Sequence, residues 1–345
     1  MKKFLLIAAM MALLMCSCGK KNAYTITGEV AGLDNSEITL LDEKGETIAS
    51  TTSDADGKFT FEGVAEEPSL AILGVHSLPV AIIFIEPGDI EVAGDINTEI
   101  TVTGTKANDH STAFAARSMA ILERYTTATS EEEMEAISEE NTRLYLETID
   151  ENLDNYFGLF LLTNMTDEMT GQELLDKLDA FTPEIKKTSL ADEIRDFAEA
   201  MTKTEAGQTY MDITLSDPEG NPVALSSLVG EGKYVLLDFW ASWCGPCMQE
   251  VPYLVDTYAT YHDKGLEIYG VSLDQNADDW KEALSENKMT WTNVMADGDA
   301  GKEAQENYAI QSIPSNFLIG PDGKIVARNL RGDDLKAKIS ELLDK

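Results

Sequence analysis

The chain is poor in cysteine, histidine and basic side chains. Its 345 residues include 4 Cys, 3 His and 26 Lys or Arg, against 62 Asp or Glu. A net charge of −36 leaves too little positive surface to neutralise phosphates, and this excludes nucleic acid as a partner. His76, His110 and His262 stand alone, without the spacing of metal ligands, so neither a metal site nor a cofactor is predicted.

The N-terminal apolar run is too short to cross a bilayer. It covers the twelve residues 4–15 and follows two lysines, whereas a spanning helix needs about 20 residues. A basic start followed by a short apolar core is typical of a secretory signal peptide. The mature chain is therefore expected to be exported.

The end of this segment, MCSCGKK at residues 15–21, resembles a bacterial lipoprotein signal. Cleavage in such signals precedes a Cys that follows a small residue, and Cys18 behind Ser17 fits better than Cys16. The resemblance implies a signal peptide at residues 1–17, lipid on Cys18 and a tether at residues 18–23. The expected location is the cell envelope, as a membrane-anchored lipoprotein facing the periplasm; an ordinary cleaved signal is the alternative.

Only Cys244 and Cys247 remain beyond the export segment. Exported proteins that depend on disulfides for stability have several, widely spaced bridges, and a bridge closing a two-residue loop constrains the unfolded chain little. The pair is therefore predicted to be there for chemistry. Half of a zinc site is disfavoured because no second Cys or His pair exists, and an inert disulfide is the other alternative.

Residues 24–106 are predicted to form a small antiparallel β domain. Alternating polar and apolar residues at 24–30 and 58–61, and a Pro-Gly break after the apolar residues 80–85, are typical of short strands joined by turns. The sequence DADG at residues 54–57 has part of a calcium loop but lacks the other ligands, so a hairpin turn is favoured.

Residues 107–206 are predicted to be a helical segment, because the apolar residues recur with helical period and Gly and Pro are scarce. The run YFGLFLL at residues 156–162 is too apolar for an exposed helix. We expect it to pack against the β domain or against a second subunit, and a homodimer is one of the expected arrangements.

Residues 207–345 are predicted to be an α/β domain with a mixed sheet flanked by helices. Residues 234–240 and 266–273 read as strands buried on both faces, with a helix at 278–286 after the second. A hairpin is expected at residues 316–319 and 324–327, and a last helix at residues 335–343.

The redox motif WCGPC lies at residues 243–247, where the first of these strands passes into a helix. The N–H groups and dipole at a helix start favour an anion and lower the pKa of a thiol placed there. Cys244 is therefore the predicted nucleophile, and Cys247, one turn further, resolves the mixed disulfide. Asp238 is a candidate proton carrier, because an acid buried in an apolar strand has a raised pKa. Glu250, three residues after Cys247 on the same side of the helix, is a second candidate.

The segment DFWASWCGPC at residues 238–247 resembles the active-site stretch of thioredoxin. Its continuation through residue 252, with GVSLD at 270–274 and YAIQSIP at 308–314, is similar to the TlpA/ResA-like thiol–disulfide oxidoreductases. The resemblance covers residues 207–345 and implies a thioredoxin-like fold there. It also implies that the β and helical segments form an N-terminal extension, which positions the redox domain, forms a dimer or selects partners.

The resemblance carries roles onto matching positions. Asp238 matches the buried acid of thioredoxin, which assists proton transfer at the inner Cys, and Glu250 matches the acid that ResA-like proteins keep after their CxxC; either could be the main proton carrier. Ile313-Pro314 matches the cis-proline loop opposite the cysteines. An extended peptide of the substrate would dock on the rim around that loop. The predicted docking residues are Trp243, Gly245, Pro246, Ile313 and Pro314.

The expected activity is the reduction of disulfides in other exported proteins, with cytochrome c precursors among the candidate substrates and an upstream thiol donor to restore the dithiol. The thioredoxin-like Gly245-Pro246 and Ile313 favour a reductant. A peroxidase of the AhpC/TSA-like peroxiredoxin type is disfavoured, because Ala241 stands where the peroxidatic motif has Thr. A redox-inactive scaffold lipoprotein is the other alternative, and the intact cysteine pair argues against it.

Overall fold

The computed structural model describes residues 22–76, 78–166 and 168–344. They form two compact units, and each is described by itself. The first comprises the described residues up to Asn164 together with Phe181–Leu190, and the second comprises those of Met165–Ala180 and Ala191–Lys345. The division runs through the helical segment predicted at 107–206. The predicted signal peptide and Cys18 lie outside the described residues.

The first unit begins with two four-stranded sheets, in the orders β4-β1-β7-β8 and β3-β2-β5-β6. Alternate residues of β1, among them Tyr24, Ile26 and Val30, are buried in the core shared with Phe59 and Phe61. The strands are β1 (Ala23–Ala31), β2 (Glu37–Leu41), β3 (Thr47–Thr52), β4 (Lys58–Val64), β5 (Ser69–Val75), β6 (Leu78–Ile85), β7 (Gly88–Asp95) and β8 (Ile100–Thr103).

The predicted β domain is confirmed, but the alternation of polar and apolar residues could not specify one of its strand pairings. Most neighbouring strands are antiparallel, but β1 and β7 pair in parallel. The DADG segment is a hairpin turn, in which one carboxylate oxygen of Asp54 accepts hydrogen bonds of 2.9 Å from the N–H groups of Asp56 and Lys58. Its carboxylate thus caps the turn, as the hairpin interpretation requires.

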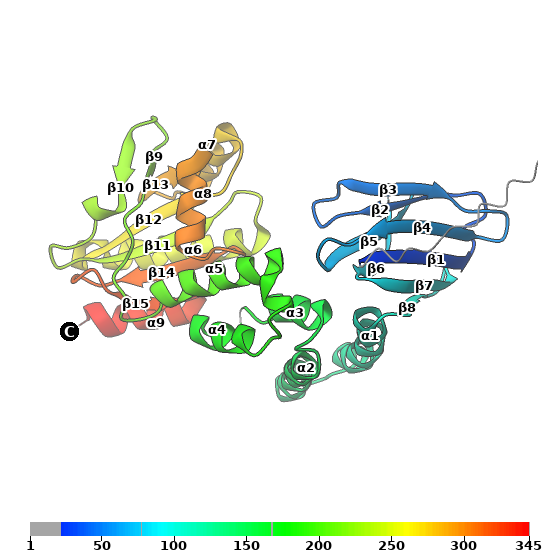
Figure 1. The fold of residues 1–345 in the computed structure, drawn as a ribbon. Helices are drawn as coiled ribbons and strands as arrows, with labels where there is room; N and C mark the ends of the chain where they lie inside the picture. Colours follow the sequence, from blue (N-terminus) through cyan, green and yellow to red (C-terminus); the bar gives the residue numbers. More distant parts are fainter. Residues whose placement is uncertain (1–21, 77, 167, 345) are drawn as a thin grey trace, which may run out of the picture. The chain divides into compact units, whose positions relative to one another are not determined.

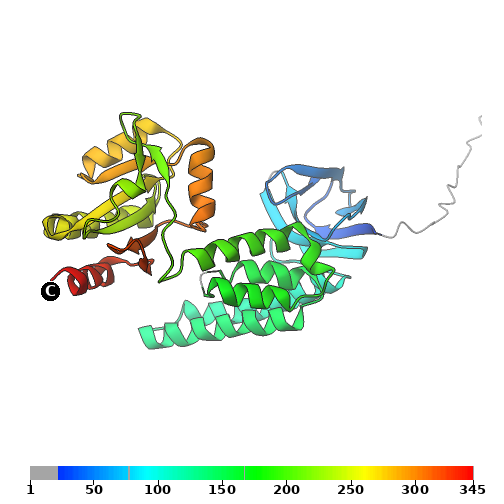
Figure 2. The same cartoon turned by 60° about the vertical axis from the view of Figure 1, so that its left-hand side comes forward.

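Three helices follow in this unit, α1 (Lys106–Tyr125), α2 (Glu131–Glu151) and α3 (Tyr156–Thr163). Helices α1 and α2 form a long helical hairpin (Figure 2). The apolar run predicted to pack against the β domain does so as α3. The rings of Phe157 and Phe160 lie with centroids 5.4 and 5.6 Å from that of Phe84 in β6.

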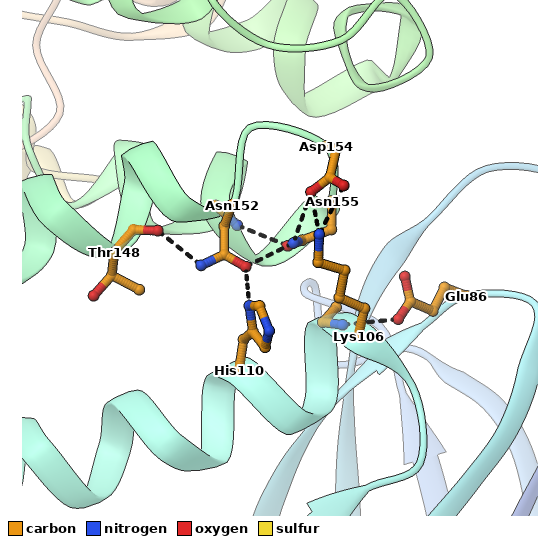
Figure 3. A network of polar contacts seen from close by, with 9 residues as sticks. Glu86, Lys106, His110, Thr148, Asn152, Asp154 and Asn155 are labelled. Carbon is orange, nitrogen blue, oxygen red and sulfur yellow. Dashed lines mark hydrogen bonds and ion pairs between the residues drawn. The ribbon is translucent and has the colours of Figure 1, made fainter.

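A polar network, buried at Asn152 and Asn155 and exposed at its Lys106–Asp154 ion pair, joins the start of α1 to the turn between α2 and α3 (Figure 3). Asn152 donates to the carbonyl of Thr148 at 2.8 Å and accepts from Asn155 at 2.6 Å, and its side-chain oxygen also contacts Nδ1 of His110. Lys106 forms an ion pair of 2.6 Å with Asp154. His110 thus has the structural role expected of an isolated histidine.

The second unit contains α4 (Gly171–Asp179), most of α5 (Ser189–Lys203) and a seven-stranded mixed sheet in the order β10-β9-β13-β12-β11-β14-β15 (Figure 1). The strands are β9 (Thr214–Ser216), β10 (Pro222–Ala224), β11 (Tyr234–Trp240), β12 (Leu266–Ser272), β13 (Thr292–Met295), β14 (Ser315–Ile319) and β15 (Ile325–Arg328). The helices of this domain are α6 (Gly245–Tyr261), α7 (Ala277–Glu286), α8 (Gly298–Asn307) and α9 (Gly332–Leu343).

This sheet confirms the α/β prediction for the C-terminal part. Strand β11 runs parallel to β12 and antiparallel to β14, and β14 forms the predicted hairpin with β15. One face packs against α6, α7 and α9, and the other against α8. The last helix begins three residues earlier than predicted, at Gly332.

The period of β11 decides where Asp238 points. Val235, Leu237 and Phe239 belong to the core on the α8 side, whereas Leu236 and Trp240 belong to the core under α6 and α9. Side chains alternate between the faces of a strand, so Asp238 shares the face of α6, the helix that carries the cysteines. None of the described helices is long and apolar enough to cross a membrane.

Candidate redox site

The two cysteines form a disulfide at the N-terminus of α6. The S–S distance is 2.04 Å and the Cα atoms are 5.2 Å apart. Cys244 is the N-cap residue, and its Sγ accepts a hydrogen bond of 3.1 Å from the backbone N–H of Cys247. Gly245 and Pro246 occupy the first turn, where the fixed φ of Pro suits a helix start and its missing N–H leaves no bond unmade. The outer sulfur therefore lies where helix N–H groups stabilise a thiolate.

The loop before β14 faces this disulfide. Its Ile313–Pro314 peptide bond is cis, as the resemblance implied. The Ile313 carbonyl oxygen lies 3.6 Å from Sγ of Cys244, although the two residues are 69 positions apart in the chain. A substrate that reacts at Cys244 thus meets the backbone of this loop.

The predicted docking rim is open at the cysteines. Trp243 is 67% exposed, and Gly245 and Pro246 are also exposed, whereas Ile313 and Pro314 are half-buried. The structure brings these five residues together around the disulfide, whose own sulfur-bearing residues are buried. Docking itself stays a prediction.

The two predicted proton carriers lie on one side of the disulfide, at the inner cysteine. Asp238, Glu250 and Cys247 line a cavity of about 10 Å³, which is the size that holds a single water molecule. Asp238 is only 4% exposed. Burial raises the pKa of its carboxyl to about 7, with the charge of Arg331 lowering that pKa and the charge of Glu250 raising it. Such a carboxyl exchanges a proton near neutral pH.

Glu250 is held in a different way from Asp238. Its Oε2 accepts a hydrogen bond of 2.8 Å from the backbone N–H of Gly332, at the start of α9. The residue is half-buried rather than enclosed. Asp238 is thus the deeper of the two carboxyls.

Two residues of the site were not identified from the sequence. Asp274 accepts hydrogen bonds from the active-site loop, a role that its place at the end of GVSLD does not indicate. Arg331, which lines the cavity beside Asp238, was missed altogether. No local pattern marks a single Arg before a helix, and its neighbours become visible only in the folded chain.

A larger cleft, of about 560 Å³, adjoins the same loop within the second unit. Pro314 and Arg331 line both this cleft and the small cavity. On its far side lie residues around α4, and Thr166 donates a hydrogen bond of 3.0 Å to Gln311 of the cis-proline loop. Part of the helical segment therefore borders the loop on which substrates are expected to dock.

This fold and site define a thioredoxin-like domain with a CxxC disulfide at a helix N-terminus. Comparison with known proteins gives two family matches. Residues 206–328 match the AhpC/TSA family, and residues 24–110 match a domain of unknown function, DUF4369.

Related proteins align over the same C-terminal part. The thiol-disulfide oxidoreductase ResA of Bacillus thuringiensis is 31% identical over 143 residues, which are 41% of this chain and 79% of the relative. ResA of Bacillus subtilis is 30% identical over 120 residues, covering 35% of this chain and 64% of the relative. A solved thioredoxin domain of a thiol-disulfide oxidoreductase from Bacteroides vulgatus is 43% identical, with a TM-score of 0.39 over 40% of this chain and 98% of the domain.

The chain belongs to the ResA-like family of thiol-disulfide oxidoreductases. Its C-terminal part is a thioredoxin-like oxidoreductase domain, and the disulfide of Cys244 and Cys247 lies within it.

Proposed function

We propose that this chain is an exported, lipid-anchored reductant of disulfides in other exported proteins. The observation that carries the redox step is the Cys244–Cys247 disulfide, seated at a helix N-terminus against the cis-proline loop, with a buried acid on the side of the inner cysteine.

The proposed reaction starts from the dithiol. The thiolate of Cys244 attacks one sulfur of a substrate disulfide, an S–S bond of a mixed disulfide forms, and the first substrate sulfur leaves and takes up a proton. Cys247 then gives its proton to the nearby carboxylate and attacks Sγ of Cys244. This releases the second substrate sulfur as a thiolate, which takes up a proton, and forms the Cys244–Cys247 disulfide. Two electrons pass to the substrate, and a dithiol donor returns them.

Insulin reduction with a dithiol as donor tests this activity. The wild-type chain is expected to turn over, Cys244→Ser to lose activity altogether, and Cys247→Ser to accumulate a mixed disulfide visible on a non-reducing gel. Hydrogen peroxide in place of insulin is expected to be consumed no faster than by Cys244→Ser. Peroxide turnover without insulin reduction would overturn the proposal.

The direction of electron flow is tested by the reduction potential of the pair. Potentials on this fold run from about −270 to about −120 mV. A reductant is expected near the lower end, and a value near −120 mV would make the protein an oxidant.

Export and anchoring rest on the N-terminal sequence. The basic start, the short apolar core and the small residue before Cys18 support cleavage and lipidation there. Two or more acyl chains would hold the mature protein at the membrane on the periplasmic side. Cys18→Ser is expected to release it from the membrane fraction, whereas the control Cys16→Ser is expected to leave it anchored.

The substrates proposed are exported proteins whose cysteines have become oxidised, with cytochrome c precursors as one class. The support for this class is the resemblance to the TlpA/ResA-like proteins. Trapping with Cys247→Ser in intact cells identifies the partners, because the resolving sulfur is absent and the mixed disulfide persists.

A further inference from the structure

Arg331 presents a cation to the backbone of the cis-proline loop. It lies directly before α9, and its guanidinium donates from Nη2 to the carbonyl oxygen of Pro314 and from Nη1 to the carbonyl of Leu330 at 2.9 Å. The residue is half-buried. An Arg keeps its charge in proteins, so this loop has a fixed positive charge against it.

The same side chain lines the cavity around the inner cysteine. Its companions there include Asp238, Cys247 and Glu250. Burial lowers the pKa of Arg331, and the negative charges of Asp238 and Glu250 offset part of that decrease. A buried charge is tolerated only beside opposite charges and hydrogen-bond partners, and Arg331 has both.

The backbone around Arg331 is fixed by two other elements. Gly332 donates to Glu250 of α6, as described above. The side-chain amide of Asn316, in β14, donates to the Leu330 carbonyl at 2.8 Å and accepts from the Leu330 N–H at 3.0 Å. The guanidinium therefore has a defined place between the loop, the active-site helix and the buried acid.

We propose that Arg331 is a positioning residue of the redox site, whose guanidinium couples the substrate-docking cis-proline loop to the proton acceptor by holding the Pro314 carbonyl and balancing the charge of Asp238. The proposal rests on the proposed function, because it assigns a part in the proton transfer from Cys247. It adds the residue directly before α9 to a site otherwise built from β11, α6 and the cis-proline loop.

The surroundings of Asp238 make the assignment specific. From α6 it meets the carboxylate of Glu250 and the disulfide-bonded Cys247, and from the position directly before α9 it meets Arg331. The neighbouring strands place Gly270 and Asn316 opposite it, and neither is charged. Among the described residues, Arg331 is the cation whose charge acts on Asp238.

The test is a titration of Asp238 in the oxidised full chain, followed by ¹³C NMR of labelled aspartate carboxyls and assigned with Asp238→Asn. In Arg331→Gln the midpoint is expected to rise by about one pH unit, because a nearby cation favours the carboxylate. Arg331→Lys keeps the charge and is expected to stay within about 0.3 unit of wild type. Arg328→Gln removes a cation that lines the outer cleft but not the cavity, and is expected to leave the midpoint unchanged.

A second readout separates the two halves of the proposal. Neither Gln nor Lys has the planar guanidinium that holds the Pro314 carbonyl, so KM for insulin is expected to rise in both Arg331 variants. Lys keeps the positive charge, so the acid limb of the pH profile is expected to move only in Arg331→Gln. A midpoint in Arg331→Gln equal to that of Arg328→Gln overturns the proposal. If Arg331→Gln does not fold, a folded Arg331→Lys whose midpoint moves by a full unit overturns it as well. The titration needs no turnover, so it is independent of whether the wild-type chain reduces insulin.

Discussion

The carboxylate of Asp274 holds Ser242, two residues before Cys244, the proposed nucleophile. The Ser242 hydroxyl donates to Oδ1 of Asp274 at 2.6 Å, and its backbone N–H donates to Oδ2 at 3.0 Å. Ser272, the last residue of β12, donates to the same Oδ2 at 2.6 Å. The loop that carries Trp243 and Cys244 is thereby tied to the end of the neighbouring strand.

Replacing this buried anchor is expected to cost both stability and activity. Both carboxylate oxygens of Asp274 accept hydrogen bonds, and Asp274→Asn replaces one of them with an NH₂ group, which is a donor. The free energy of unfolding should therefore fall by about 2 kcal/mol. A small displacement of the nucleophile should reduce insulin turnover by about tenfold. Asp263→Asn, at an exposed position of the same domain, is the control in urea unfolding and activity assays. If Asp274→Asn and Asp263→Asn had the same stability and the same activity, Asp274 would not anchor the loop.

The buried acid is expected to make the oxidised protein less stable as the pH rises. The pKa of Asp238 is about 7 in the folded chain and near 4 when unfolded, so the folded state binds the extra proton between these values. The free energy of unfolding contributed by this residue therefore falls from about pH 4 to about pH 7, by at most roughly 4 kcal/mol.

Asp238→Asn removes this dependence, and the variant should be more stable than wild type at pH 8 but not at pH 4. Because the many other acids also titrate, the quantity to measure is the difference in unfolding free energy between the two proteins across this range. A difference that does not change with pH would show that Asp238 ionises as an ordinary carboxyl.

Substitutions of Glu250 and of Arg331 by Gln should move the acid limb of the pH profile of insulin reduction in opposite directions. The negative charge of Glu250 raises the pKa of Asp238, so Glu250→Gln should shift the acid limb of insulin reduction to lower pH, by about half a unit to one unit. Glu303→Gln, on an exposed part of α8, is the matched control. If Glu250 itself were the main proton carrier, its loss would instead abolish the limb and the turnover with it.

Loosening the packing of α3 on the β domain should lower the stability of the first unit without changing that of the second unit, which contains the cysteine pair. Phe157 is 2% exposed and its ring meets that of Phe84, so Phe157→Ala should destabilise the first unit by about 3 kcal/mol. All four Trp lie at positions 240–291, in the second unit. The far-UV circular dichroism transition should therefore shift to lower urea while the Trp fluorescence transition stays in place.

Met119→Ala, on the exposed part of α1, is the control for that substitution. A parallel shift of both transitions in Phe157→Ala would show that the two units unfold together.

Much of the fold was predictable because its signals are local. The alternation in residues 24–30 and the apolar strand at 234–240 depend on side chains that are neighbours in the chain, and both became strands, β1 and β11. The parallel pairing of β1 with β7 was not predictable, because alternation identifies a strand without naming its partner. The division of the helical segment between two units likewise depends on contacts with distant residues.

By itself, the sequence determined the cysteine pair at the start of a helix and the buried acid on the preceding strand. Two cysteines three positions apart can meet at a helix start through local geometry alone, and an acid within an apolar strand is buried wherever that strand packs. Only the tertiary structure decided what surrounds them. Ser242 and Asp274 are 32 residues apart, and Glu250 and Gly332 are 82 apart. Electrostatic and hydrogen-bond energies depend on distance in space, so the partners that tune this site exist only once the sheet has brought those segments together.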